Sequence, residues 1–254
     1  MVVDRLTVVT YNIWFGEHRW RERLAHLLEL VARRRPDIIA FQEVTPLQLE
    51  QLLATDWICR DYLVSDISGS SVTPHGVVLL SRLPMRDLAL CHLPSRKDRK
   101  LLTATVDTGH GALSVGTLHL ESSPENALLR SAQLKRVLSQ QSESRDALLM
   151  GDFNFDQPVG AQQARIGQNY IDLWSFLSDG RAAGHTVDST RNRMRFLQKR
   201  KHKHMRFDRI LLRSPATVWV PRCIRLIGTE PISGAMPDTY PSDHFGLVAT
   251  IERQ

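Results

Sequence analysis

Polar residues able to bind a metal ion or move a proton recur where apolar runs of this sequence begin or end. Taken alone, each is more often a turn former, a helix cap or a satisfied buried group. Two occurrences are more specific: GDFN follows the apolar run ALLM, and SDHFGL leads into another apolar run. Unpaired polar groups beside a buried strand are costly, which favours a function for them. The strand-end residues are Asn12, Glu43, His119, Asp152, Asn154, Asp208, Asp243 and His244.

The composition of this set favours a hard divalent cation. Carboxylates without the Cys and His pattern of a zinc site predict Mg²⁺, and Mn²⁺ would suit the same oxygens. Hydrolysis of a phosphate ester needs such a cation, an acid that orients water, and a histidine cation. Its barrier is mainly charge on the phosphate oxygens and placement of the attacking water. The residues therefore predict a Mg²⁺-dependent hydrolase of phosphate esters, provided that the distant loops converge on one ion.

The elements that must position these residues are short strands interspersed with a few amphipathic helices. Apolar runs predict strands at 6–12, 37–42, 76–81, 86–91, 101–107, 112–118, 147–150, 207–212, 217–227 and 247–251. Helical periodicity predicts a helix through 24–31 that ends before Pro36, and others at 46–53, 126–141 and 171–177. This order predicts α+β layers, with two sheets packed together and helices outside. Without repeats or a long linker, residues 1–254 are expected to form one domain.

The composition excludes several classes of protein. With 42% hydrophobic and 24% charged residues, the chain of 254 residues is neither disordered nor collagen-like. No uncharged apolar run approaches the roughly 18–20 residues of a membrane span, and Asp4 and Arg5 precede any apolar block that could serve as a secretory signal. The three cysteines form neither a disulfide framework nor a metal pattern. We expect an intracellular monomer without a membrane partner, cytoplasmic, or nuclear in a eukaryote.

The net charge of +6 comes from one block of the sequence. Between Arg191 and Arg209, nine basic residues face one acid, Asp208, so this block carries +8 and the remaining chain −2. A concentrated basic block indicates a polyanionic partner, although a solvated loop kept soluble by its charge would have the same composition. The residues expected to contact nucleic acid are Lys199, Arg200, Lys201 and Lys203.

Six motifs along the chain resemble those of the endonuclease/exonuclease/phosphatase superfamily. In order they are TYNIW, FQEV, TLHLES, GDFN, FDRILL and SDHFGL, and they extend from Asn12 to Leu247. The resemblance implies a four-layered α/β sandwich of two packed, mostly antiparallel sheets flanked by helices, with the site at one end of the facing sheets. Further stretches, including HLESSPEN, TVDSTRN and MRFDRILLR, are most similar to members that hydrolyse 5′-tyrosyl–DNA bonds.

The resemblance also implies roles at the metal. Glu43 would hold the catalytic Mg²⁺, with Asn12 close to the metal and the scissile phosphate. Asp243 would support the metal or its water shell. Asp152 would position and deprotonate the attacking water.

Further implied roles concern the phosphate. His244, oriented by Asp208, would stabilise the charge on the five-coordinate phosphorus, and Asn154, like His119, would bind phosphate oxygens. With His119, the residues implied to bind the substrate are Ser122, Arg206 and Trp14.

Three positions depart from the pattern of the tyrosyl–DNA-hydrolysing members. Trp14 stands where those members commonly have Asp, Asp156 where they have Arg, and Val187 where they have a Trp that packs against nucleic acid. The missing cation and the missing aromatic ring would each remove about 1–3 kcal/mol of substrate binding. The basic block and Trp14 could supply other contacts.

We expect a Mg²⁺-dependent phosphodiesterase that acts on DNA ends and hydrolyses the 5′-phosphotyrosyl bond of a protein–DNA adduct. A phenolate with a pKa near 10 needs less protonation on leaving than a sugar alkoxide. The same residues would serve an abasic-site endonuclease, an exonuclease, an RNase, or a phosphatase of inositol or phospholipid head groups. An inactive nucleic-acid-binding module is a third possibility, which the intact GDFN and SDH motifs disfavour.

Overall fold

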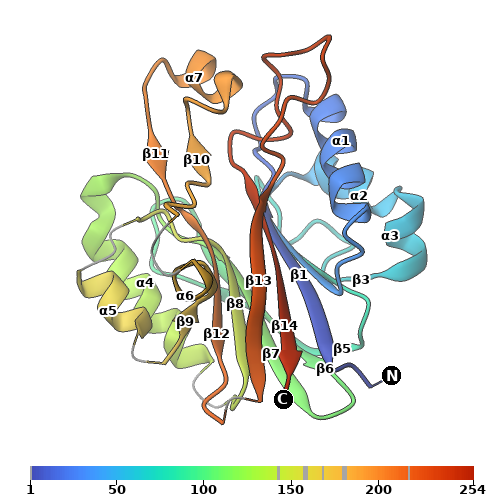
Figure 1. The fold of residues 1–254 in the computed structure, drawn as a ribbon, viewed down its shortest axis with the longest axis vertical. Helices are drawn as coiled ribbons and strands as arrows, with labels where there is room; N and C mark the ends of the chain where they lie inside the picture. Colours follow the sequence, from blue (N-terminus) through green and yellow to red (C-terminus); the bar gives the residue numbers. More distant parts are fainter. Residues whose placement is uncertain (1, 142–143, 157–159, 168, 179–181, 217) are drawn as a thin grey trace.

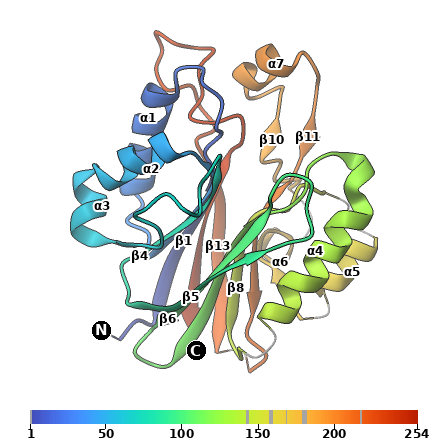
Figure 2. The same ribbon diagram turned by 180° about the vertical axis from the view of Figure 1, so that it is seen from behind.

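Two sheets face each other in the structure, and helices cover the outer face of each (Figures 1 and 2). The structure, a computed structural model, describes residues 2–141, 144–156, 160–167, 169–178, 182–216 and 218–254. A smaller pair of strands, with a helix between them, rises from one end of the second sheet (Figure 1).

The first sheet has the strand order β13-β14-β1-β2-β4-β3. Its strands are β1 (Arg5–Asn12), β2 (Ile38–Val44), β3 (Leu63–Val64), β4 (Gly76–Ser81), β13 (Trp219–Ile227) and β14 (Gly246–Arg253). Strands β1 and β2 are parallel, and the other neighbours are antiparallel. Its outer face is covered by α1 (Trp20–Ala32), α2 (Pro46–Leu53) and α3 (Asp56–Asp61).

The second sheet has the strand order β5-β6-β7-β8-β12-β9. Its strands are β5 (Met85–His92), β6 (Lys100–Asp107), β7 (Ala112–His119), β8 (Ala147–Asp152), β9 (Ile171–Asp172) and β12 (Asp208–Arg213), with only β7 and β8 parallel. The helices on the outer side of this sheet are η1 (Pro124–Asn126), α4 (Ala127–Gln140) and α5 (Ala161–Gly167), whereas α6 (Leu173–Leu177) packs Leu173 and Trp174 against the cluster between the two sheets. The small pair is β10 (Val187–Asp188) and β11 (His204–Met205), with α7 (Arg193–Lys199) between them.

Apolar side chains fill three spaces between the four layers. Val8, Val115, Met150 and Ile210 belong to the cluster between the two sheets. On one outer side the expected helix face of Leu24, Leu27, Leu28 and Val31 packs against the first sheet, and on the other α4 packs against the second. The four-layered sandwich of mostly antiparallel sheets is thus confirmed.

The elements absent from our prediction are short. Helices α3, α5 and α7 have six or seven residues, too few for a clear apolar period. The segment expected as a helix over 171–177 begins instead as a strand, because Asp172 caps the helix by accepting from the N–H of Trp174 at 3.1 Å. Among the described residues, no helix is long and apolar enough to span a membrane.

Gly151 lets β8 lie close to β7 just before the candidate site. Its φ is 142°, and a Cβ there would lie 2.0 Å from the carbonyl oxygen of Leu118. We expect Gly151→Ala to lower the free energy of unfolding by about 3 kcal/mol or more, because the clash adds to backbone strain. Gly111 has the same φ of 142° but nothing within 4 Å, so Gly111→Ala measures the strain alone, about 1 kcal/mol. Equal losses in urea unfolding would contradict this steric explanation.

Candidate active site

The second sheet places three of the expected residues in one row. His119 ends β7, Asp152 ends β8 and Asp208 begins β12. The register pairs His119 with Asp152 and Asp152 with Asp208. All three side chains are buried. Strand pairing alone therefore brings together residues that lie up to 89 positions apart in the numbering.

The first sheet contributes Asn12, at the end of β1, and Glu43, near the end of β2. Glu43 lies at a bulge, where the register shifts between Gln42 and Val44, and its φ is 62°. Bulges re-aim side chains, and strained backbone of this kind gathers at functional sites. Asn12 Nδ2 donates to Glu43 Oε1 and to Asp152 Oδ2, both at 3.1 Å. The amide of Asn12 thus links the two sheets at the centre of the cluster.

The loop before β14 adds His244 and closes the cluster. Ser242 Oγ donates to the carbonyl oxygen of Asn12 at 2.6 Å and accepts from the N–H of His244 at 3.2 Å. His244 Nδ1 lies 2.8 Å from Asp208 Oδ2. The loop is therefore held on one side by β1 and on the other by β12.

Burial and mutual charge set the protonation of this cluster. One ligand atom from each of Asp152, Asp208 and His244 lies within 4.8 Å of the other two. Burial, and then the charge of Asp208, raises the pKa of Asp152 to about 7. Burial alone would lower the pKa of His244, but Asp208, supported by other carboxylates, raises it to about 10. At neutral pH the cluster therefore contains an imidazolium beside a carboxyl group that can act as a base.

His119 has the opposite protonation. Burial, and then the charge of Arg99, holds the pKa of His119 well below its usual range. Arg99 Nη1 lies 2.9 Å from His119 Nδ1, and because guanidinium only donates, Nδ1 accepts and Nε2 carries the hydrogen. Nε2 lies 3.3 Å from Asp152 Oδ2. His119 is thus a neutral donor aimed at the cluster.

Two supporting residues were missed by sequence reasoning. Arg99 lies in the charged stretch SRKDRK, which indicates only a break between strands. Thr186 Oγ1 accepts from the N–H groups of Phe207 and Asp208, both at 3.1 Å, and so fixes the start of β12. Arg99 has no local sequence signal, because it acts on a partner distant in the chain. Thr186 opens the stretch TVDSTRN, which carries part of the family resemblance but gave no role for the threonine.

The donors of the cluster suit a divalent cation. Asp208 Oδ1 is buried and has no hydrogen-bond partner within the described residues. Burial, and then the charge of Asp243, also raises the pKa of Glu43, so both Glu43 and Asp152 would be stabilised as carboxylates by a nearby cation. A protonated imidazole cannot act as a ligand, which leaves the carboxylate oxygens rather than His244 to hold the ion.

Three further expected residues have the following contacts. Asn154 has a φ of 54°, and its N–H donates to Asp152 Oδ1 at 2.8 Å. Asp243 Oδ2 lies 3.8 Å from Arg195 Nε. Ser122, which follows β7, accepts from Lys97 Nζ at 2.6 Å.

The structure does not place Arg206 or Trp14 at an open face of the cluster. Arg206 is buried, and its Nη1 pairs with Asp172 Oδ2 at 2.7 Å. Trp14 is 8% exposed, and the guanidinium of Arg23 lies 4.4 Å from the centre of its ring. Both side chains are held by internal partners, and the substrate contacts expected of them stay predictions.

The basic block does not face solvent as one arm. Arg206 and Arg209 both pair with Asp172 inside the protein. Lys203 is half-buried, with Nζ 4.3 Å from the centre of the Phe207 ring. Of the four residues expected to contact nucleic acid, three are exposed. They lie at the end of α7 and are Lys199, Arg200 and Lys201.

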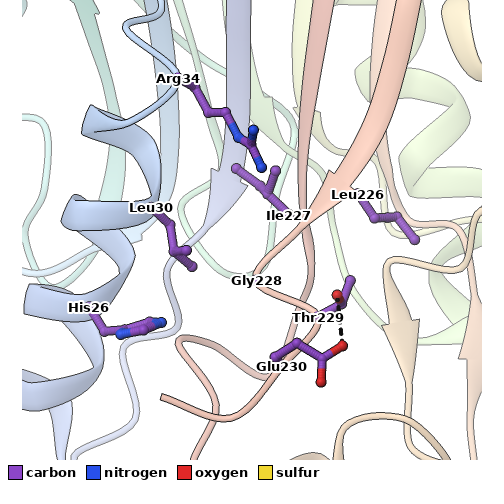
Figure 3. Close-up of a pocket in the computed structure, with 8 residues that line it drawn as sticks. All are labelled: His26, Leu30, Arg34, Leu226, Ile227, Gly228, Thr229 and Glu230. Atoms are coloured by element: carbon purple, nitrogen blue, oxygen red, sulfur yellow. Dashed lines mark hydrogen bonds between the residues drawn. The ribbon is translucent and has the colours of Figure 1, made fainter. Parts of the chain in front are cut away.

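A separate pocket of about 210 Å³ lies between α1 and the end of β13 (Figure 3). His26 and Leu30 line it from α1, Arg34 lines it from the turn after this helix, and Gly228 and Glu230 belong to the opposite wall. None of the expected site residues lines it, so it is distinct from the cluster at the strand ends.

Comparison with known proteins agrees with this geometry. The profile of the Endonuclease/Exonuclease/phosphatase family matches residues 9–244. Tyrosyl-DNA phosphodiesterase 2 of Mus musculus is 29% identical over 237 residues, 91% of this chain and 61% of that protein. The human protein of the same name is 28% identical over 255 residues, 97% of this chain and 68% of its own length. The chain therefore spans about two thirds of these relatives.

Solved structures agree on the fold. The structure of D. rerio TDP2 complexed with a single-strand DNA product has a TM-score of 0.83 at 24% identity, over 98% of this chain and 100% of that one. The human Nocturnin catalytic domain has a TM-score of 0.72 at 18% identity, over 99% of this chain and 94% of that one. These structures confirm the implied fold, and the family match over residues 9–244 confirms the superfamily.

Proposed function

Because the chain belongs to the endonuclease/exonuclease/phosphatase family, we propose that it is a metal-dependent phosphodiesterase that hydrolyses the 5′-phosphotyrosyl bond of a protein–DNA adduct. The observation that carries this proposal is the buried cluster into which two sheets and one loop bring Asn12, Glu43, Asp152, Asp208 and His244. The names of the relatives support the substrate. The oxygen donors support Mg²⁺, and they would suit Mn²⁺ as well.

Glu43, with Asn12 beside it and Asp243 nearby, would hold the cation, which when bound offsets the negative charge of the scissile phosphate. Asp152 takes a proton from the attacking water. Its pKa of about 7 suits a base that works near neutral pH. The N–H of Asn154 and the amide of Asn12 hold the two oxygens of this carboxyl group in place.

The histidines and Asn154 act on the phosphate oxygens. His244 donates from Nε2, because Nδ1 is bonded to Asp208, and its positive charge stabilises the five-coordinate phosphorus. His119 Nε2, which faces Asp152 without substrate, and the second hydrogen of Asn154 Nδ2, which also donates to the carbonyl oxygen of Leu120 at 3.0 Å, would bind the remaining oxygens. Water forms the new P–O bond, the bond to tyrosine breaks, and the phenolate leaves with the electron pair. The products are a 5′-phosphorylated strand and a free tyrosine side chain.

A cavity of about 150 Å³ beside Asn154 is a suitable place for the adjoining nucleotide. Phe155, Met205 and Phe207 give it apolar walls, and Lys203 provides a cation. Aromatic faces stack on bases of any sequence, and a cation pairs with phosphate. Lys203 would therefore act at this cavity, while the cations at the end of α7 reach more distant phosphates.

A substrate panel with an end-group readout tests the proposal. We expect the protein with Mg²⁺ to convert a 5′-phosphotyrosyl oligonucleotide into a 5′-phosphate product, and EDTA to stop the reaction. Preference for an abasic duplex, an RNA or an inositol phosphate would overturn the tyrosyl assignment but keep the chemistry. Tight DNA binding without turnover of any ester would favour an inactive module instead.

The role of the exposed cations can be tested by salt dependence. The triple variant combines Lys199→Ala, Arg200→Ala and Lys201→Ala. We expect its plot of log binding constant for single-stranded DNA against log salt concentration to be less steep than that of the wild type. The slope should change by about 0.7 for each phosphate that these cations neutralise in the wild type. Turnover of a p-nitrophenyl phosphodiester should be unchanged, because these residues lie outside the cluster. A matched control replaces the exposed Arg33, Arg34 and Arg35 at the end of α1 by Ala. An equal slope in both variants would assign the α7 cations to solubility.

The remaining expectations concern location and assembly. DNA as substrate requires a compartment that contains DNA, so we place the protein inside the cell, and in the nucleus of a eukaryote. We propose that residues 1–254 act as one domain and as a monomer, because every residue of the cluster comes from a single chain. Light scattering of the active protein tests this, and a dimer would contradict it.

A further inference from the structure

We propose that His185, Asp188 and His204 form a second metal site, suited to zinc, at the base of the β10–β11 pair. One ligand atom from each residue lies within 4.8 Å of the other two. These residues are distinct from the carboxylate cluster at the strand ends. The inference does not depend on the proposed reaction.

The β10–β11 pairing brings the three residues together. Asp188 on β10 is the register partner of His204 on β11. Asp188 Oδ1 lies 3.1 Å from His204 Nδ1. His185 is three positions before Asp188, and its ring centre lies 5.8 Å from that of His204. Two imidazoles and a carboxylate thus gather at one place on the hairpin.

Neighbouring groups already orient two of these ligands. Thr190 Oγ1 lies 3.3 Å from His204 Nε2, so it can accept the hydrogen of that nitrogen while Nδ1 faces Asp188. The N–H groups of Thr190 and Arg191 donate to Asp188 Oδ1 at 3.0 and 3.1 Å. Metal-binding histidines characteristically have their second nitrogen held by an oxygen in this way.

The donor set selects a borderline cation rather than Mg²⁺. Imidazole suits Zn²⁺, whereas Mg²⁺ prefers an all-oxygen shell. Zinc bonds of about 2.0–2.1 Å would place tetrahedral ligands about 3.4 Å apart, which needs only side-chain adjustment here. The side chain of His204 is 42% exposed, so water can take the fourth position. The hairpin site would therefore select Zn²⁺ through its imidazole ligands, and the carboxylate cluster would select Mg²⁺ through its oxygen ligands.

An ion at this place would brace the hairpin against the active cluster. Thr186, next to His185, accepts from the N–H of Asp208 through its hydroxyl and from the N–H of Phe245 through its carbonyl at 2.7 Å. The same hairpin carries α7 with its exposed cations (Figure 1). In this proposal zinc has a structural role, and its removal would make the hairpin less stable.

Equilibrium dialysis of the chelator-treated full chain against Zn²⁺ in excess Mg²⁺, with metal analysis, tests the site. We expect one zinc per chain, lost in His204→Asn. Thr190→Val keeps all three ligands and should weaken zinc binding by about 10–100-fold. The control is His202→Asn on the same hairpin, whose ring stacks on Phe196 instead, and which should retain zinc. Asp152→Asn should also retain it.

The proposal is overturned if the wild-type chain holds no zinc above the dialysis buffer, or if Asp152→Asn rather than His204→Asn removes it. Equal loss in His202→Asn and His204→Asn would also overturn it. Amide hydrogen exchange of the hairpin, measured with and without zinc, distinguishes loss of the metal site from misfolding. Zinc should slow exchange in the hairpin of the wild type and of His202→Asn, and should leave exchange in the hairpin of His204→Asn unchanged.

Discussion

Asp152→Asn is expected to lower kcat on a 5′-phosphotyrosyl oligonucleotide by about 10²–10⁴-fold, the usual loss when a general base is removed. An amide cannot take the proton of the attacking water. KM should change little, because Asp152 acts on the attacking water and has no assigned contact with the substrate. Asn can accept from the N–H of Asn154 through its one oxygen, while its amide nitrogen replaces the oxygen that accepts from Asn12. Single-turnover assays with saturating Mg²⁺ measure this loss.

Stability separates this loss of activity from misfolding. Folding raises the pKa of Asp152 from 3.8 to about 7, so the folded state favours the protonated carboxyl group. The ionised group therefore lowers stability increasingly as the pH rises from about 4 to 7, and fully above 7. Asn removes this cost, so without metal the Tm at pH 8 should equal or exceed that of the wild type.

A matched control lies at the other end of the same strand. Asp146, next to the start of β8, accepts from Ser214 Oγ at 2.5 Å and is outside the cluster. Asp146→Asn should keep the wild-type rate. An unchanged rate in Asp152→Asn would refute the assigned base, whereas a parallel loss of rate in both variants would show that the strand, not the carboxyl group, matters.

The strand ends were predictable from the sequence because strands carry a local signal. The apolar run 147–150 predicts β8, and the polar residues after it must then lie at the end of the sheet. The bounds of α2 follow from Pro46 at its start and from the capping box of Thr45 with Gln48. The residues alone did not predict that all these strand ends meet in one site. The resemblance of the motifs to the superfamily implied this, because in that fold the site lies at one end of the two facing sheets.

Partners formed at long range were not predictable. Arg206 stands in a basic block of the sequence, but in the structure it is buried and pairs with Asp172, 34 positions earlier, a carboxylate that it shares with Arg209. From the sequence, Trp14 is expected to contact the substrate. In the structure its φ is 59°, and its side chain is buried in a cluster with Met194 and Tyr240. In both cases burial depends on distant residues that no window of the sequence contains.

The second large effect concerns His244 and Asp208. His244→Gln is expected to lower kcat by about 10²–10³-fold, because a preorganised donor and its positive charge are lost at the phosphate. Asp208→Asn should lower kcat as well, since Asp208 acts through the orientation and charge of His244. The double variant should lose little more than His244→Gln alone, because residues that act as a unit are not additive.

The pH profile gives an independent test of the same pair. In the wild type, kcat/KM should rise as Asp152 loses its proton near pH 7 and fall as His244 loses its proton near pH 10. A bound cation stabilises the carboxylate of Asp152 and moves the acid limb to lower pH. Because the charge of Asp208 raises both pKa values, Asp208→Asn should move both limbs to lower pH. Movement of the acid limb alone would show that Asp208 does not hold His244 in its charged form, and the role assigned to this imidazolium would have to be abandoned.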